Sequence, residues 1–179
     1  KDSSVAWINF PVKDVNKNAD IIATSLGFSS TLVPIILSSY LSAYEDRETE
    51  MGLMLPAVAV NKFEVLISPI LILIRKDLIV TIHDENVKRL IRFSRYADAF
   101  MRKIKPHIAL EDKLSMILTR IIDENNNNNF EHLRKLEAQG DELSKSLLDT
   151  MTPRATIAPE IYNMKHALIN YLDTLWATL

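Results

Sequence analysis

The sequence lacks cysteine, has only three glycines in 179 residues, and has no long uninterrupted apolar run. Without cysteine there are no disulfide bonds, no thiolate-ligated zinc and no thiol nucleophile. So few glycines argue against a glycine-rich phosphate loop, and no Walker-type motif occurs. The longest apolar stretch, Val65 to Ile74, is interrupted by Ser68 and Pro69. A membrane-spanning helix needs about 20 apolar residues, so we expect none within this sequence.

Charge and motif content exclude further classes of function. The formal net charge of −2 provides no basic stripe for nucleic acid. No serine lies in a Gly-x-Ser-x-Gly nucleophile elbow. The four histidines, His83, His107, His132 and His166, lack the spacing of metal ligands, and we interpret them as structural or surface residues. The sequence therefore predicts neither an enzyme nor an organic cofactor.

The first part of the chain predicts a sheet flanked by helices. Val5 to Phe10 is typical of a buried strand, and Asp14 and Gly27 are suited to begin and end the next helix. A second short helix is expected over Ser29 to Tyr40, beginning or kinking near Pro34. Three β-rich runs joined by short polar turns then predict an antiparallel meander: Met51 to Val60, Phe63 to Arg75 and Asp77 to His83.

Two features of this region carry further expectations. Ile70 to Ile74 is apolar at every position, so that strand should be covered by helices on both faces. The segment Tyr44 to Thr49 is expected to be an edge strand and belongs to an acidic cluster. Its carboxylates could hold a hard cation through oxygen ligands, but a charged edge that discourages aggregation is the favoured interpretation. The cluster consists of Glu45, Asp46, Glu48 and Glu50.

The second part of the chain is dominated by helical periodicity. A helix is expected over Asn86 to Ile104, followed by an amphipathic stripe from Leu114 to Leu148. The polar run Asp123 to Asn129 interrupts this stripe, so the region is either one long helix or two helices broken at the asparagines. After a break over Thr150 to Pro159, a final helix over Glu160 to Leu179 should pack antiparallel on its predecessor.

These patterns predict an α/β fold of α+β type. We expect an α/β/α sandwich with a largely antiparallel sheet, followed by long antiparallel helices of stalk type. Residues 1–106 would form the sandwich core, and residues 107–179 would be helices that pack on it and start the stalk, within one structural domain. Asp123, Glu124 and Asn125 to Asn129 also offer oxygen ligands to a cation, although a solvated or helix-breaking segment is favoured from spacing alone.

Four segments resemble the cytoplasmic N-terminal domain of the CorA family of magnesium transport channels. Trp7-Ile8-Asn9 is similar to that family's Trp-Ile-Asp/Asn strand, and Leu78 to His83 to its Leu-Ile-Thr-Val-His strand. Ile121-Ile122-Asp123 and the leucines up to Leu148 follow its Leu-Ile-Asp helix without a gap. Lys165 to Leu179 is similar to the next helix of the family. The resemblance covers nearly the whole chain as a pattern of apolar positions.

This resemblance implies a regulatory part of a divalent-cation channel rather than an enzyme. Members of the family form homopentamers in the cell membrane and transport Mg²⁺, often with Co²⁺ or Ni²⁺. The transmembrane helices, with the diagnostic Gly-Met-Asn, would follow Leu179. The residues seen here would then lie on the cytoplasmic side of the cell membrane, with identical subunits and the membrane as partners.

The resemblance also assigns one site residue. Asp123 matches the aspartate of the family's Leu-Ile-Asp motif, which takes part in a regulatory Mg²⁺ site between subunits that holds the pore closed. A second family site uses an acidic pair, but Leu32 to Leu37 has no carboxylate at that place. The alternative hypothesis is a soluble scaffold or interaction module without a transport role, in which the helix over Leu114 to Leu148 pairs with a partner helix.

Overall fold

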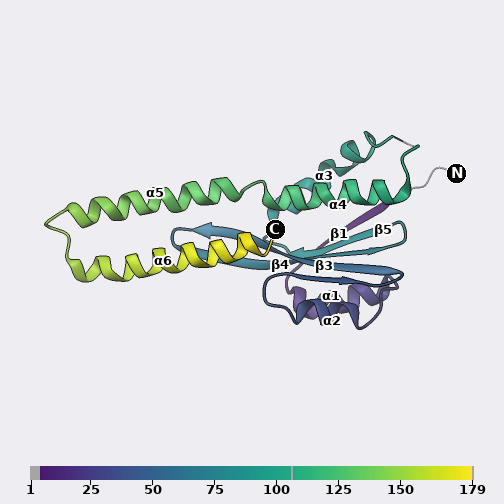
Figure 1. Cartoon of the computed structure of the whole chain (residues 1–179), viewed down its shortest axis with the longest axis horizontal. Coiled ribbons are helices and arrows are strands. Elements are labelled where there is room, and N and C mark those ends of the chain that lie inside the picture. The colour runs from purple at the N-terminus through teal and green to yellow at the C-terminus, as the bar shows by residue number, and fades with distance from the viewer. Residues whose placement is uncertain (1–4, 106, 179) are drawn as a thin grey trace. The chain divides into compact units, whose positions relative to one another are not determined.

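The computed structural model describes residues 5–105 and 107–178, and its helices and strands follow the predicted order (Figure 1). The elements are β1 (Ala6–Val12), α1 (Val15–Ser25), α2 (Leu32–Leu37), β2 (Ala43–Asp46), β3 (Glu50–Asn61), β4 (Glu64–Arg75), β5 (Leu78–Asp84), α3 (Lys88–Met101), α4 (Leu110–Asn126), α5 (Asn129–Leu148) and α6 (Arg154–Trp176). None of the helices in the described ranges is long and apolar enough to cross a bilayer.

The chain divides into two compact units. The first contains the residues up to Ala57 together with Ser68–Asn126, and the second contains Val58–Ile67 and the residues from Asn127 onward. The helix α4 thus belongs to the first unit, and the turn between β3 and β4 belongs to the second. The domain boundary predicted near residue 106 stays a prediction.

The sheet has the strand order β1-β5-β4-β3-β2. The pairs β2–β3 and β4–β5 are antiparallel, whereas β1 pairs with β5 in parallel, with Trp7 beside Ile79 and Asn9 beside Thr81. The predicted meander is therefore confirmed. Its tight turns place Lys62 and Lys76 at positive φ, 51° and 53°, as the twist of two-residue hairpin turns requires.

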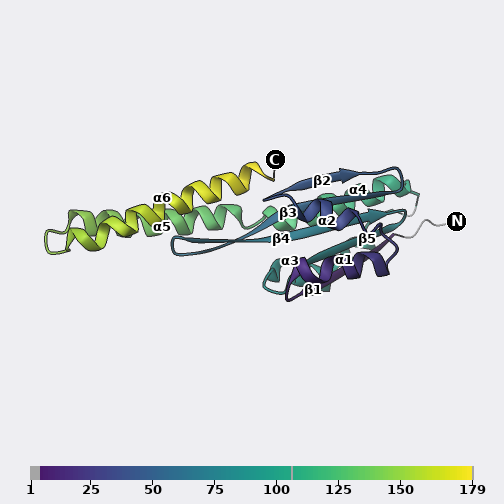
Figure 2. The same ribbon diagram turned by 90° about the horizontal axis from the view of Figure 1, so that it is seen from below.

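Helices cover both faces of the sheet in the first unit (Figures 1 and 2). On one face, α1 and α2 pack against alternate residues of β4, including the fully buried Leu71 and Leu73. On the other face, α3 and α4 pack against Ile70 and Ile72. Successive strand residues point to opposite faces, so the uninterrupted apolar run supplies two cores. The predicted α/β/α sandwich is confirmed.

The short helices of this unit follow local chemistry. Asp14 caps α1 by accepting a hydrogen bond from the Lys17 backbone N–H at 3.2 Å, and Gly27, at φ 86°, ends it. The helix α2 is shorter than the stretch from Ser29 to Tyr40 that the sequence predicted. Pro34 is its third residue, where the missing N–H has no acceptor within the helix, so the helix begins just before the proline.

The second unit is an antiparallel pair of helices, α5 and α6, with the β3–β4 turn residues (Figure 1). Its core contains Val58, Leu136, Ala167 and Tyr171, and the Tyr171 hydroxyl donates to the Asn129 carbonyl at 2.6 Å. The long amphipathic region is thus two helices, α4 and α5, broken at the asparagines, which was one of the two predicted alternatives.

One boundary was predicted wrongly. The helix α6 begins at Arg154 rather than at Glu160, and Pro159 lies inside it. Pro153 precedes the first turn in an extended conformation, and the added turn buries Ile157, which is 5% exposed. A proline in a helix removes one backbone hydrogen bond, and the burial of an isoleucine, about 1.5–3 kcal/mol, offsets much of that cost.

Candidate functional site

Asp123, the residue assigned by resemblance, lies in the last turn of α4 and faces outward. Its side chain is 54% exposed. The Arg120 Nη1 donates a hydrogen bond to Asp123 Oδ2 at 2.7 Å, and the two residues form an ion pair one helical turn apart. The carboxylate is therefore accessible to solvent but already has a cationic partner on its own helix.

Arg120 has a second acidic partner in the next residue, Glu124. The Arg120 Nη2 lies 2.5 Å from Glu124 Oε1, and the Tyr96 hydroxyl donates to the same oxygen at 2.8 Å. The Glu124 side chain is only 10% exposed. The guanidinium also lies over the ring of Phe93, 5.8 Å from its centroid. Burial, and then the hydrogen bond to Glu124, raise the pKa of Tyr96.

The next polar residue, Asn125, is buried and ties α4 to its neighbours in the first unit. The Arg89 Nη2 donates to Asn125 Oδ1 at 2.8 Å, and Asn125 Nδ2 donates to the Pro56 carbonyl at 2.9 Å. Consecutive helical residues point about 100° apart, so Asp123, Glu124 and Asn125 do not converge on one point. The polar run thus combines one exposed carboxylate with two residues that hold the fold.

An open groove of about 700 Å³ runs along α4 beside Asp123. Its walls are mainly apolar, with Phe100, Ile108 and Met116 among the lining residues. Asp112 and Asp123, eleven positions apart on α4, both line it. The face that carries Asp123 is therefore hollowed and largely apolar, with two carboxylates along it.

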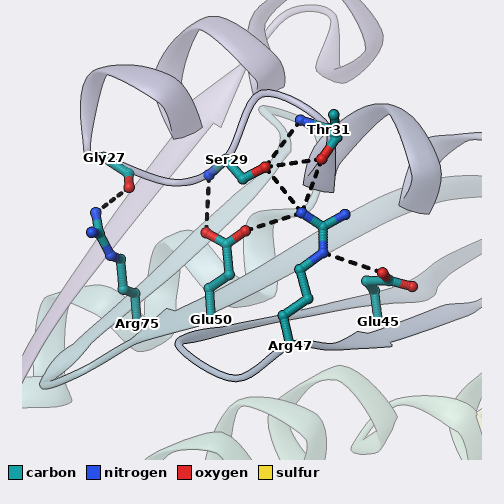
Figure 3. A network of polar contacts seen from close by, with 7 residues as sticks. All are labelled: Gly27, Ser29, Thr31, Glu45, Arg47, Glu50 and Arg75. Carbon is teal, nitrogen blue, oxygen red and sulfur yellow. Dashed lines mark hydrogen bonds and ion pairs between the residues drawn. The ribbon is translucent and has the colours of Figure 1, made fainter.

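The acidic cluster around β2 forms a different arrangement (Figure 3). The Arg47 Nε donates to Glu45 at 3.2 Å, and its Nη1 donates to Glu50 at 3.2 Å and to the hydroxyls of Ser29 and Thr31 at 2.9 Å. Glu50 also accepts the Ser29 backbone N–H at 2.9 Å. Arg47 thus neutralises two of the four acidic residues, and β2 is an edge strand, which supports the structural interpretation of this cluster.

Sequence reasoning missed a polar chain between β1 and β5. The Trp7 indole donates to Thr81 Oγ1 at 3.0 Å, and that hydroxyl donates to Asn9 Oδ1 at 2.6 Å. The His83 Nε2 lies 3.0 Å from the same Asn9 oxygen. Thr81 and His83 are fully buried, and burial lowers the pKa of His83. Alternating polar residues in two strands that pair in parallel were the signal that could have revealed it.

These residues account for two of the segments that carry the resemblance. Trp7 and Asn9 on β1, with Thr81 and His83 on β5, hold the parallel strand pair together rather than forming an exposed site. His132 is buried in the second unit near Tyr171, with ring centroids 6.4 Å apart, and His107 and His166 are exposed. The four histidines are therefore not brought together.

Within residues 5–105 and 107–178, no group of three or more His, Cys, Asp or Glu side chains could hold a metal ion. A hard divalent ion takes about six or more oxygen ligands, whereas the motif aspartate offers one carboxylate beside a guanidinium. The residues of one chain do not by themselves fit such an ion. In the second candidate region, α2 has no carboxylate; Leu32, Val33 and Ile36 are buried, and Ile35 is 47% exposed.

Comparisons with solved structures show the same fold. The soluble domain of CorA from Methanocaldococcus jannaschii is 20% identical with a TM-score of 0.70, and the match covers 97% of this chain and 66% of that one. The complete CorA magnesium transporter of the same organism is 19% identical with a TM-score of 0.72, and the match covers 99% of this chain and 54% of that one. The ZntB cytoplasmic domain from Vibrio parahaemolyticus RIMD 2210633 is 12% identical with a TM-score of 0.56, over 89% of this chain and 62% of that one.

Sequence comparisons give the family. No curated protein matches the chain in a direct search. The family model described as "CorA-like Mg2+ transporter protein" matches residues 2–179, almost the entire sequence. The match agrees with the sandwich fold and with the resemblance noted in the sequence. The chain therefore belongs to the family of CorA-like Mg²⁺ transporter proteins.

Proposed function

We propose that this chain is the regulatory domain of a CorA-like channel for divalent cations, and that Asp123 helps to sense Mg²⁺ where subunits meet. The observation that carries the proposal is the position of Asp123. The motif aspartate is 54% exposed, while the neighbouring Glu124 and Asn125 are occupied inside the fold. A carboxylate in this position is accessible to groups outside its own chain.

The groove beside Asp123 supports a contact with another subunit. Phe100, Ile108 and Met116 leave an apolar hollow along α4, and apolar hollows of this kind suit contact surfaces. Carboxylates that meet there across subunits would repel one another. A hard divalent cation relieves this repulsion, so its binding favours the arrangement in which the subunits are close. An ion shifts such an equilibrium only through its different affinities for the two arrangements.

The rest of the proposal follows the family. The protein acts as a homopentamer that conducts Mg²⁺, and possibly Co²⁺ or Ni²⁺, and this domain lies on the cytoplasmic side of the cell membrane. The membrane helices belong to a part of the protein outside this sequence. Mg²⁺ is both the transported and the regulatory ion. The chain has no catalytic role and no nucleic-acid partner.

A titration of the full-length protein with Mg²⁺ tests the role of Asp123. Millimolar Mg²⁺ should raise the melting temperature and the protease resistance, because a ligand that binds only the folded assembly stabilises it. Asp123→Ala should reduce this response. Asp141→Ala is the matched control, because Asp141 is an exposed aspartate on the helix α5. An equal Mg²⁺ response in the Asp123 variant and the control would refute Asp123 as a ligand.

The structure weakens the alternative of a scaffold that offers its long amphipathic stripe to a partner helix. That stripe is divided between α4 and α5. Ile117 and Ile121 of α4 are buried in the sandwich core, and Leu136 and Leu143 of α5 are also buried. The apolar positions that motivated the alternative are therefore largely occupied within the chain.

A further inference from the structure

The groups around Asp123 raise the question of what neutralises this carboxylate before an ion arrives. Arg120 contacts two successive carboxylates through separate nitrogens, Nη1 to Asp123 at 2.7 Å and Nη2 to Glu124 at 2.5 Å. The two partners differ in their surroundings, because the Asp123 side chain is 54% exposed and that of Glu124 is 10% exposed. One guanidinium therefore links an interior carboxylate to a surface one.

We propose that Arg120 is an internal competitor of the divalent cation at Asp123. Its guanidinium neutralises Asp123 while the ion is absent, and it leaves Asp123 when the ion binds. Arg120 thereby sets the ion concentration at which Asp123 responds. The inference rests on the proposed function, because it takes Asp123 to be an ion ligand.

The geometry makes this exchange inexpensive for the fold. When Asp123 turns to an ion, Arg120 keeps its contact with Glu124 and its position over Phe93. Only the outer ion pair is lost, and exposed pairs of this kind contribute little to stability and are screened by salt. The interior contacts hold the guanidinium near Asp123, so it is ready to pair again when the ion leaves.

The competitor also affects which ions can act and under which conditions. A monovalent cation brings no more charge than the guanidinium it would displace, whereas a divalent cation brings twice as much, so the exchange favours divalent ions. Arginine stays protonated at every physiological pH. Competition by Arg120 is therefore constant with pH, and the threshold is set by ion concentration.

The test measures the Mg²⁺ midpoint of the full-length protein, by melting temperature and by protease resistance, in matched variants. Arg120→Gln removes the competing charge and should lower the midpoint by about twofold to fivefold, the range that an exposed ion pair contributes. Arg120→Met keeps a long stem over Phe93 and serves as a second variant if the glutamine protein folds poorly. Lys135→Gln is the control, because Lys135 pairs with Glu131 at 3.0 Å on another exposed helix surface.

The outcomes separate this inference from the proposed function. A lowered midpoint in the Arg120 variants but not in Lys135→Gln, lost when Asp123→Asn is added, supports the competition. If Asp123→Asn abolishes the response but neither Arg120 variant shifts the midpoint, the competition is refuted and the role of Asp123 stands. If Asp123→Asn leaves the response unchanged, Asp123 is not a ligand, and both proposals fail.

Discussion

Phe93 is the side chain whose removal should most clearly expose how the sandwich supports the site. It is fully buried between α3, α4 and the sheet. Its ring centroid lies 5.0 Å from that of Trp7 and 5.3 Å from that of Tyr96, and the Arg120 guanidinium lies over it. The residue therefore joins the core of the sheet to the residues that orient Arg120.

Phe93→Ala should lower the free energy of unfolding by about 4 kcal/mol, within the range of about 3–5 kcal/mol for buried phenylalanines. The loss combines the transfer of the ring from a dry core, the cavity that remains, and two aromatic contacts worth about 0.5–1.5 kcal/mol each. Whole domains are stable by only about 5–15 kcal/mol. The variant should therefore be folded but close to its limit at moderate temperature.

Urea denaturation followed by circular dichroism measures this change. Tyr40→Ala is the control, because Tyr40 is an aromatic residue of the same unit that is 91% exposed, and its loss should change stability by less than about 0.5 kcal/mol. A loss below about 1 kcal/mol in Phe93→Ala, or a loss equal to that of the control, would refute the packing described for this face of the sheet.

Two further predictions concern the fold. Burial lowers the pKa of His83 below its model value of 6.5, so the unfolded chain binds more protons between those two pKa values. Stability should therefore rise with pH over that window, by at most about 1.4 kcal/mol per pH unit from this group. An NMR titration in which His83 protonates above pH 6.5 would contradict this. Gly52→Ala should cost about 1–3 kcal/mol by overpacking, because a Cβ there would meet the buried Ile36 side chain; an unchanged urea midpoint would show that this contact relaxes freely.

The sheet and its helices could be predicted because each depends on local periodicity. Ile70 to Ile74 has no polar position, and the structure shows why, since alternate residues enter two separate cores. The turn at Lys76-Asp77 was predicted from its length and polarity, and Lys76 has the positive φ of such a turn. The start of α6 was missed because prolines were taken as the boundary, whereas burial of Ile157 extends the helix through Pro159.

The polar chain of Trp7, Asn9, Thr81 and His83 could not be predicted from either strand alone. It depends on a parallel pairing between segments more than 70 positions apart, such as Asn9 and Thr81. A sequence pattern reports which face of its own strand a residue occupies, but not which partner lies beside it. For the same reason, the pairing of Arg47 with Glu45 and Glu50 became clear only with the register of the edge strand.

The candidate site shows this limit most clearly. Asp123, Glu124 and Asn125 are adjacent polar residues, and the sequence offers all three equally as oxygen ligands. The helix turns each to a different environment. Glu124 joins Tyr96 and Arg120, and Asn125 bridges Arg89 and the Pro56 carbonyl. An ion that recruited either residue would first have to break contacts that hold α4 in place. Asp123 gives up only a solvent-exposed pair, so of these three residues it is the one able to exchange partners while the fold stays intact.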